Sequence, residues 1–274
     1  MFAPPDLARR IEAAEAGLLT ALARHATAAA VTGAPLVEAI DGGAAVFVRP
    51  GAPMNKLVGI GFDGPLDAAR LATIEAAFAA RSAPLQVELA TLARCEAAQQ
   101  FAARGYRLVA FENVLGCDPR QFVPRPTPHR VEPATGPAAD WVETMADSFL
   151  AADGTGAGTA DAFARTEVVA AMGELAAVPT LRRYAVRDAG TMLGGASLHL
   201  HGRTAQLCGA ATAPPFRRRG VQAALLAARL RDAAAAGCDV AVMTAQPGSL
   251  SQHNAQRQGF ALLYARAILV KDPG

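Results

Sequence analysis

The segment 212–222 is the part of the chain whose residue types best suit the binding of an anion. An apolar run at 205–211 precedes it and leucines at helical spacing follow it, so the pattern predicts a strand, a tight turn and a helix. The turn holds three arginines and a glycine: Arg217, Arg218, Arg219 and Gly220. A helix start offers unpartnered N–H groups and partial positive charge, glycine admits a ligand close to the backbone, and arginine adds planar donors. The predicted ligand is a phosphate or pyrophosphate.

Two common phosphate loops do not fit this turn. A P-loop ends in Gly-Lys-Ser/Thr and a dinucleotide fingerprint has three spaced glycines, and the turn has neither pattern. The stretch Arg217-Arg218-Arg219-Gly220-Val221-Gln222 instead resembles the pyrophosphate loop of GNAT-type acetyltransferases, Arg/Gln-x-x-Gly-x-Gly/Ala. Gln222 departs from that pattern, in which a small residue is usual. The alternative interpretation is a solvated basic turn that caps an ordinary helix.

Composition and charge narrow the function classes. The 274 residues are enough for one large or two ordinary domains, and a hydrophobic content of 52% predicts a folded α/β protein. A net charge of +2 with dispersed basic residues argues against a nucleic-acid partner. Four widely spaced cysteines predict reduced thiols, a cytoplasmic location and no metal site: Cys95, Cys117, Cys208 and Cys238. We expect no secretory signal and no membrane association, because the sequence lacks the necessary apolar stretches.

Two halves with the same order of elements are predicted. The first has a helix ending near Ala28, strands at 36–40, 44–48 and 56–62, a helix at 66–80, a strand at 85–89, a helix at 95–104 and a strand at 106–115. The second has an edge strand at 129–133, helices at 138–150 and 160–175, strands at 181–187, 192–200 and 203–211, the basic turn and its helix, a strand at 239–243, a helix at 249–258 and a strand at 260–270. A proline-rich linker at 121–128 is predicted to separate a domain at 1–120 from one at 129–274.

The two halves also share a register. Aligning Gly105-Tyr106 with Gly259-Phe260 sets an offset of 154 positions (259 minus 105), which places strand on strand and helix on helix. This indicates an internal duplication, with two unrelated α/β halves of similar periodicity as the alternative. The same offset lays Asp63-Gly64-Pro65-Leu66 on Arg217-Arg218-Arg219-Gly220. With a carboxylate, a proline without an N–H and no glycine at the last position, the first half is not expected to bind pyrophosphate.

The resemblance to the GNAT family extends over the second half, where residues 254–260 are similar to the last helix of the family and its Gly-Phe exit. It implies two tandem GNAT-like folds, each a mixed, mostly antiparallel sheet flanked by helices, the first with a degenerate loop. It also implies acetyl-CoA as the acyl donor, with its pantetheine arm along a strand end that separates from 239–243. The implied cofactor-binding residues are Ala211, Thr212, Ala213, Arg217, Arg218, Arg219, Gly220, Val221, Gln222, Ala223, Ser251 and Asn254.

The residue that protonates the leaving thiolate does not follow directly from the resemblance. Many family members have a tyrosine four residues before the Gly-Phe exit, but Ala255 stands there in this chain. Nearby residues that can donate a proton are His253 and Tyr264. Tyr264 is the predicted catalytic acid, and a packed tyrosine with a satisfied hydroxyl is the alternative.

Candidates for a catalytic base, for attraction of the amine and for a substrate lid also have simpler explanations. His199 and His201 share one face of a strand, as expected either for a catalytic base or for a polar strand face. Glu143 and Asp147 share a helix face, where they attract a cationic amine or are merely solvated. The glycine-rich segment 153–158 has the composition of a substrate lid or of a plain connection.

The predicted function is acetyl-CoA-dependent N-acetylation of a small-molecule amine, with the C-terminal half catalytic. Because a thioester is already activated, such an enzyme mainly positions the amine and stabilises the oxyanion with a backbone amide. A non-catalytic acyl-CoA-binding regulatory protein is the alternative, since the helix tyrosine is missing. Docking of the arginines on nucleic acid is poorly supported at this net charge. The sequence is compatible with a monomer or a homodimer.

Overall fold

The computed structural model describes residues 2–26, 35–151 and 164–273. The first half of the chain forms α1 (Pro5–Ala26), β1 (Leu36–Ile40), β2 (Gly43–Phe47), β3 (Lys56–Val58), α2 (Ala68–Ala79), β4 (Leu85–Ala90), α3 (Cys95–Ala103) and β5 (Arg107–Cys117). The second half forms β6 (Val131–Pro133), α4 (Ala139–Leu150), α5 (Arg165–Ala177), β7 (Arg182–Asp188), β8 (Thr191–His201), β9 (Thr204–Thr212), α6 (Val221–Ala235), β10 (Val240–Ala245), α7 (Leu250–Arg257) and β11 (Ala261–Lys271). Short 3₁₀ turns lie at Pro119–Gln121 and Pro214–Phe216.

The predicted elements occur in the predicted order, and most of their ends differ from the predicted ones by one or two residues. β3 ends at Val58 rather than at residue 62, because Gly59 and Gly61 adopt positive φ angles of 77° and 86° that turn the chain out of the sheet. α5 begins at Arg165, and residues 160–163 of the predicted helix lie outside the described residues. The predicted glycine-rich segment 153–158 lies outside the described residues.

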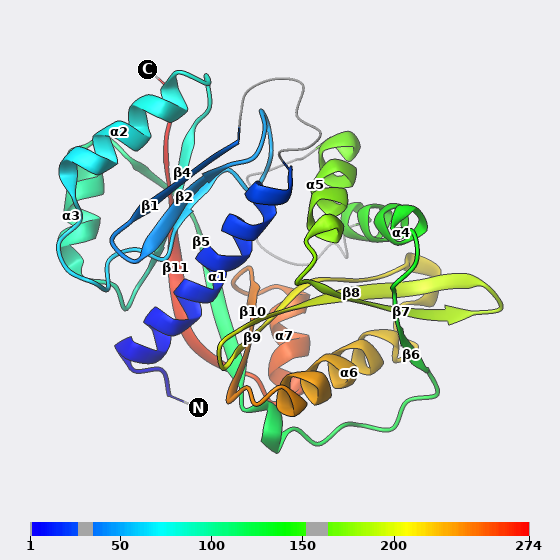
Figure 1. The fold of residues 1–274 in the computed structure, drawn as a ribbon. Coiled ribbons are helices and arrows are strands. Elements are labelled where there is room, and N and C mark those ends of the chain that lie inside the picture. Colours follow the sequence, from blue (N-terminus) through cyan, green and yellow to red (C-terminus); the bar gives the residue numbers. More distant parts are fainter. Residues whose placement is uncertain (1, 27–34, 152–163, 274) are drawn as a thin grey trace.

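The strands of both halves form one continuous mixed sheet (Figure 1). Across the described residues the strand order is β1-β2-β3-β4-β11-β5-β10-β9-β8-β7-β6. Neighbouring strands are antiparallel except for the pairs β3/β4 and β9/β10, which are parallel. The predicted mixed, mostly antiparallel α/β fold is therefore confirmed.

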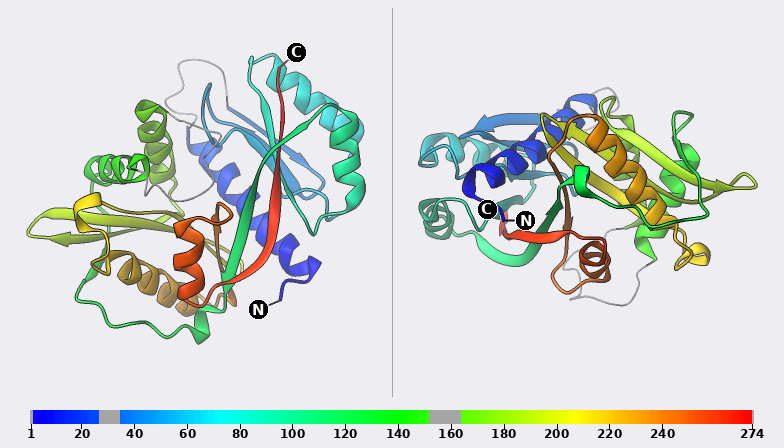
Figure 2. Two further views of the ribbon diagram at one scale, coloured as in Figure 1. Left: turned by 180° about the vertical axis from the view of Figure 1, so that it is seen from behind. Right: turned by 90° about the horizontal axis from the view of Figure 1, so that it is seen from below.

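The two halves exchange their last strands. β5, which ends the first half, pairs with β10 of the second half, and β11, which ends the second half, pairs with β4 of the first. β5 and β11 also pair with each other, side by side at the centre of the sheet, as Figure 2 shows from behind. The predicted domains 1–120 and 129–274 are thus joined through the middle of one sheet.

The pairing of β5 with β11 is nearly symmetric, and it has the offset found in the sequence. Glu112 lies opposite Arg266, and these two residues are 154 positions apart (266 minus 112). The same offset interchanges the two flanking pairs, Phe111 with Ala267 and Asn113 with Ala265, because 111 plus 154 is 265 and 113 plus 154 is 267. Residues of β5 near Glu112 therefore pair with residues of β11 close to those that lie 154 positions later in the chain. This is expected for a duplicated unit folded about a two-fold-like axis.

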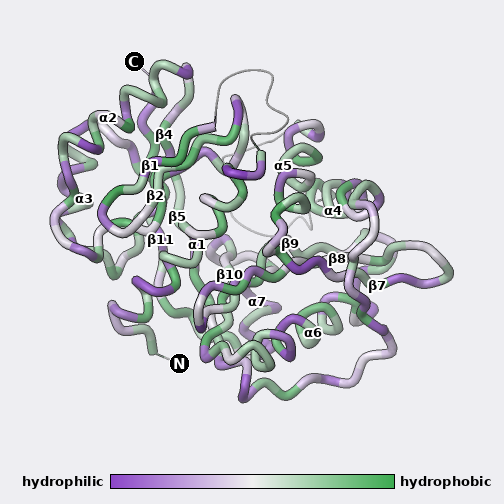
Figure 3. Tube along the Cα trace, viewed as in Figure 1, coloured by the Kyte–Doolittle hydropathy of each residue, from purple (hydrophilic) through white to green (hydrophobic). Residues whose placement is uncertain are grey.

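α1 spans the sheet and packs against both halves (Figure 1). Leu18, Leu19 and Leu22 of this helix share one hydrophobic cluster with Val46 of β2 and Leu175 of α5. Separate clusters lie under α2 and α3 in the first half and under α6 in the second. Figure 3 shows this pattern as a hydrophobic stretch in β2 and mixed colouring along α2 and α3, which each bury one face.

A group of charged side chains is buried between α1 and the central strands. We call it the α1 charge cluster, and its members are Glu12, Glu15, Lys56, Glu88, Glu112 and Arg266. The Arg266 side chain is 2% exposed and lies 2.8 Å from Glu12, 2.9 Å from Glu88 and 3.2 Å from Glu112. These contacts connect α1, β4, β5 and β11, so they hold the exchanged strands and the helix in one arrangement.

Replacing Arg266 by methionine should destabilise the protein strongly. Removal of one partner of a buried ion pair typically costs about 3–5 kcal/mol, because the remaining charges stay buried without compensation. The loss should shrink as the pH is lowered, since the orphaned carboxyl groups of the folded variant then take up protons. Urea denaturation at several pH values measures both effects.

Arg203→Met is the matched control. Arg203 is 64% exposed in its 3.0 Å ion pair with Asp239, and surface pairs of this kind contribute less than about 1 kcal/mol. An equal effect of the two substitutions would contradict a special role for the cluster.

Candidate active site

A gap opens in the sheet where β9 and β10 separate. Their parallel pairing covers only Thr204–Gln206 and Val240–Val242, although β9 continues to Thr212 and β10 to Ala245. Opposite this gap the β8–β9 register shifts beside Ser197 and Cys208, and Gly209 adopts a φ of 50°. The bulge bends β9 away from β10 and leaves the backbone of the β9 end unpaired on the side of the gap.

The basic turn connects the end of β9 to α6. Arg218 and Gly220 adopt left-handed φ angles of 62° and 88°, which a residue other than glycine adopts at a cost. Gly220 is the N-cap of α6, and among the described residues no side chain caps the first amides of this helix. The positive end of α6 therefore presents unoccupied N–H donors to a ligand.

The counterpart of this turn in the first half is already filled by a carboxylate. Asp67 caps α2 and accepts hydrogen bonds from Ala69 N at 2.9 Å and Arg70 N at 3.0 Å. Asp63, the residue aligned with Arg217, lies 3.6 Å from Arg9. The sequence comparison singled out Asp63, Pro65 and Leu66, but it missed Asp67, although an aspartate before a helix is a known capping signal.

The three arginines of the turn differ in their surroundings. Arg217 donates to the carbonyl groups of Thr212, at 3.3 Å, Ser148, at 3.1 Å, and Ala151, so it ties the turn to the C-terminal end of α4. Arg218 and Arg219 are exposed. The Arg219 guanidinium lies 5.6 Å from the centre of the Phe216 ring. The turn is thus held by Arg217 and presents the other two arginines outward.

The other predicted cofactor-binding residues come from three elements. Ala211, Thr212 and Ala213 are at the end of β9, and Val221, Gln222 and Ala223 form the first turn of α6. Ser251 and Asn254 lie on α7, which follows β10, with Ser251 exposed and Asn254 half-buried. The structure therefore brings the β9 and α6 residues together at one end of the gap, and α7 packs against β10 on its other side.

Tyr264, the predicted catalytic acid, is buried in a different environment. Its hydroxyl group donates a 2.7 Å hydrogen bond to Glu12, and burial raises its pKa above the ordinary value. Its hydrophobic neighbours include Ile11 and Val242, whereas Val221 at the start of α6 belongs to a separate cluster. No contact joins Tyr264 to the basic turn among the described residues, so its role as an acid stays a prediction. His253 is exposed on α7.

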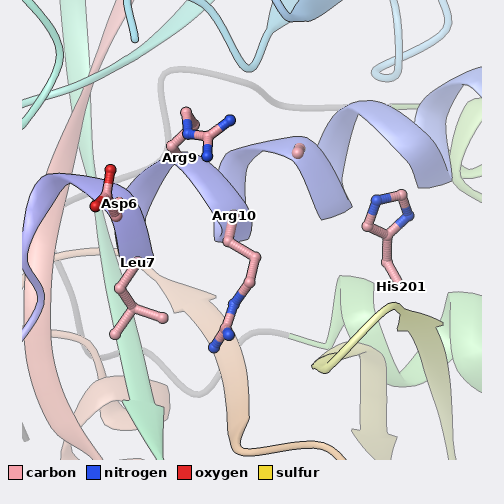
Figure 4. A pocket seen from close by; sticks show the side chains of 6 residues that line it. Asp6, Leu7, Arg9, Arg10 and His201 are labelled. Atoms are coloured by element: carbon pink, nitrogen blue, oxygen red, sulfur yellow. The ribbon is translucent and has the colours of Figure 1, made fainter.

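The remaining candidates, two acidic residues and two histidines, lie on α4 and β8. Glu143 and Asp147 both pair with Arg165 of α5, which occupies their charge. His201 is exposed at the end of β8, beside an open hollow of about 420 Å³ that also involves Arg9 and Arg10 of α1 (Figure 4). His199 is 5% exposed, and burial lowers its pKa to about 4.

The titration of His199 makes a testable contribution to stability. Its pKa is about 4 in the folded protein against 6.5 for a freely solvated histidine, so the unfolded chain takes up a proton first as the pH falls. Stability should therefore decline between pH 6.5 and 4, by up to about 3 kcal/mol from this group. A His199→Leu variant should lose less stability over this range in urea denaturation, while His201→Leu keeps most of the wild-type decline, because burial is the larger cause of the lowered pKa of His199. Equal acid sensitivity in wild type and His199→Leu would contradict this explanation.

Two other kinds of feature are absent from the residues that the structure describes. These residues contain no group of three or more histidine, cysteine or acidic side chains placed to hold a metal ion. They also contain no helix long and apolar enough to cross a membrane.

Comparison with known proteins agrees with this geometry. Residues 145–260 match the family model described as "Acetyltransferase (GNAT) family", whereas no curated protein matches the chain significantly. A GCN5-related N-acetyltransferase from Kribbella flavida superposes with a TM-score of 0.62 at 19% identity, covering 94% of this chain and 95% of its own. A tandem GNAT protein from the clavulanic acid biosynthesis pathway superposes with a TM-score of 0.55 at 14% identity, covering 84% and 74%. At these identities the superpositions show a shared fold. The chain therefore carries a domain of the GNAT family of acetyltransferases at residues 145–260.

Proposed function

We propose that the protein is an acetyl-CoA-dependent N-acetyltransferase that acts on the amine of a small molecule, with the second half of the chain holding the donor. The observation that carries this proposal is the difference between the two equivalent helix starts. Within the described part of the chain, the N-terminus of α6 has a left-handed glycine cap and no side-chain acceptor, whereas that of α2 is capped by Asp67. Only α6 offers its amides to the pyrophosphate of coenzyme A.

The gap between β9 and β10 suits the rest of the donor. Pantetheine has amide groups, and the end of β9 has backbone groups that β10 does not pair. A pantetheine arm lying along Ala211, Thr212 and Ala213 would take the place of the missing strand and carry the thioester toward the narrow end of the gap. There a β9 amide can stabilise the oxyanion of the tetrahedral intermediate.

The first half of the chain has a structural role in this proposal. We infer that residues 1–120 do not bind a second acetyl-CoA, and that 121–128 connect two units of common origin. We also infer a reducing, cytoplasmic environment from the four cysteines, all of which are free.

A non-catalytic acyl-CoA-binding regulator is the second candidate. Two observations favour it: Ala255 replaces the tyrosine that many relatives use as an acid, and the Tyr264 hydroxyl already donates to Glu12. Release of free thiol from acetyl-CoA in the presence of primary amines separates the two functions, because only an enzyme turns over.

Gly220→Asp should weaken the binding of acetyl-CoA. A carboxylate at this position repels the pyrophosphate and competes for the α6 amides, so we expect affinity to fall by at least about tenfold. Gly64→Asp is the matched control, because Gly64 also has a positive φ, 118° against 88°, and lies in the corresponding loop of the first half. Calorimetric titration with acetyl-CoA measures both affinities, and equal affinity of the two variants would contradict the placement of the donor.

A further inference from the structure

The α1 charge cluster contains more negative than positive charge. Its four carboxyl groups, Glu12, Glu15, Glu88 and Glu112, face only two cations, Lys56 and Arg266. Burial raises the pKa of Glu12, Glu15 and Glu112, while the neighbouring cations Lys56 and Arg266 lower that of Glu88. A buried excess of negative charge favours the binding of either protons or a cation.

Two buried polar atoms in and beside the α1 charge cluster lack hydrogen-bond partners in the part of the chain that the structure describes, which indicates that a polar group binds there. Among the described residues, Glu12 Oε2 and Gln206 Oε1 are buried without a hydrogen-bond partner. Both side chains are more than nine-tenths buried, at 1% and 8% exposure. The Gln206 amide lies within the cluster, because its Nε2 donates to Glu15 Oε2. Such atoms are normally satisfied in folded proteins, so a polar ligand or water is expected to complete them.

The cluster opens toward the gap between β9 and β10. Glu112 and Glu15 are its most exposed acids, with side chains 28% and 13% accessible. Gln206, the partner of Glu15, is the last β9 residue paired with β10. Glu112 directly precedes Asn113, which pairs with Ala245 at the end of β10.

The strand β10 has an accessible position on the side of the sheet that carries these acids. Val242 of β10 packs into the cluster that contains Ile11 of α1, so this side of β10 faces α1. Thr244, two residues further along the same face, is exposed. Thr244 is therefore an accessible position of β10 on the α1 side of the sheet, on the strand edge that the proposed thioester would meet.

We propose that the acceptor of this enzyme is a cationic amine attracted by the carboxylates of Glu15 and Glu112, and that Glu15 is the base that takes its proton. This inference rests on the proposed acetyl transfer and adds to it a substrate class and a catalytic residue from the N-terminal helix. Among the described residues Glu15 makes its contacts to Gln206 and Arg266 through Oε2, so Oε1 can accept a hydrogen bond from the ammonium group.

The reaction balances without any further co-reactant. Glu15 accepts one proton from the ammonium group, and the neutral nitrogen attacks the thioester carbonyl carbon. The C–N bond forms and the C–S bond breaks, while the second nitrogen proton goes to the departing thiolate. The products are the acetamide, coenzyme A as a thiol and one proton, which Glu15 returns to solvent.

The pH dependence follows from the groups that face Glu15. Arg266 and Lys56 stabilise its carboxylate, whereas Glu12, Glu88 and burial itself oppose ionisation, and the result is a raised pKa. Because the base must be ionised to accept a proton, activity should fall as the pH drops through this raised pKa. The acid limb of kcat/KM should therefore lie above the ordinary range of a glutamate.

Acetylation of 1,4-diaminobutane, with 4-aminobutanoate as the comparison, tests the proposal. The diamine should be preferred by about tenfold or more, because the carboxylate of 4-aminobutanoate is repelled by the acids.

Glu15→Gln should lower kcat/KM by roughly 100-fold and remove the acid limb of the pH profile. Glu112→Gln should raise KM by about tenfold with little change in kcat, since it only loses attraction for the cation. Glu38→Gln, at an exposed 3.4 Å pair with Arg70 on the far edge of the sheet, is the control and should behave as wild type.

Calorimetric titration with acetyl-CoA distinguishes failure of this inference from failure of the proposed function. The affinity of Glu15→Gln for acetyl-CoA should equal that of wild type, which also shows that the variant folds. If Glu15→Gln retains activity within about threefold of wild type, or if 4-aminobutanoate is preferred, the inference is wrong. It is also wrong if the wild-type protein binds acetyl-CoA but neither binds nor acetylates 1,4-diaminobutane. Absence of acetyl-CoA binding in the wild type would instead refute the proposed function, and the inference with it.

Discussion

Charge that is buried must be compensated, and this constraint shapes the centre of the molecule. Arg266 and Glu112 face each other at the point about which β5 and β11 are symmetric, and Glu12 and Glu88 complete the coordination of the arginine. The guanidinium group therefore ties α1 to strands from both halves. Replacing this set by apolar side chains would preserve packing, but it would remove the directional contacts that select one arrangement of helix and strands.

The α1 charge cluster also links the first half of the chain to the proposed acetyl transfer. The proposed donor site is built from β9, the basic turn and α6, all in the second half. The acids proposed to attract the acceptor come from α1 and β5, which precede residue 120. Under the proposed function the two halves would divide the work: the second half would supply backbone donors for coenzyme A, and the first would supply negative charge for the acceptor. A GNAT domain ending at the match boundaries 145–260 contains only the first of these.

Much of the fold could be predicted from the sequence, because hydrophobic periodicity and turn residues are local signals. The elements, their order and the offset of 154 positions agree with the structure. The exchange of β5 and β11 was not predicted, because alternating hydrophobicity identifies a strand and not its partner. The basic turn was found since its residues are contiguous, whereas the acids of the α1 charge cluster lie at positions 12, 15, 88 and 112 and are brought together only by the fold. Tyr264 was singled out as a proton donor, and its hydrogen bond to Glu12 could not be read from the sequence.

The exchanged strands also bear on how such a chain evolves. β11 is paired on both sides by strands of the first half, so deletion of that half would leave the final strand of the second without either neighbour. A duplicated copy can therefore lose its own ligand and still be retained by selection, because the surviving copy depends on it to complete its sheet. Divergence is then free to act on loops such as Asp63–Leu66, while the strands on either side of them stay under constraint.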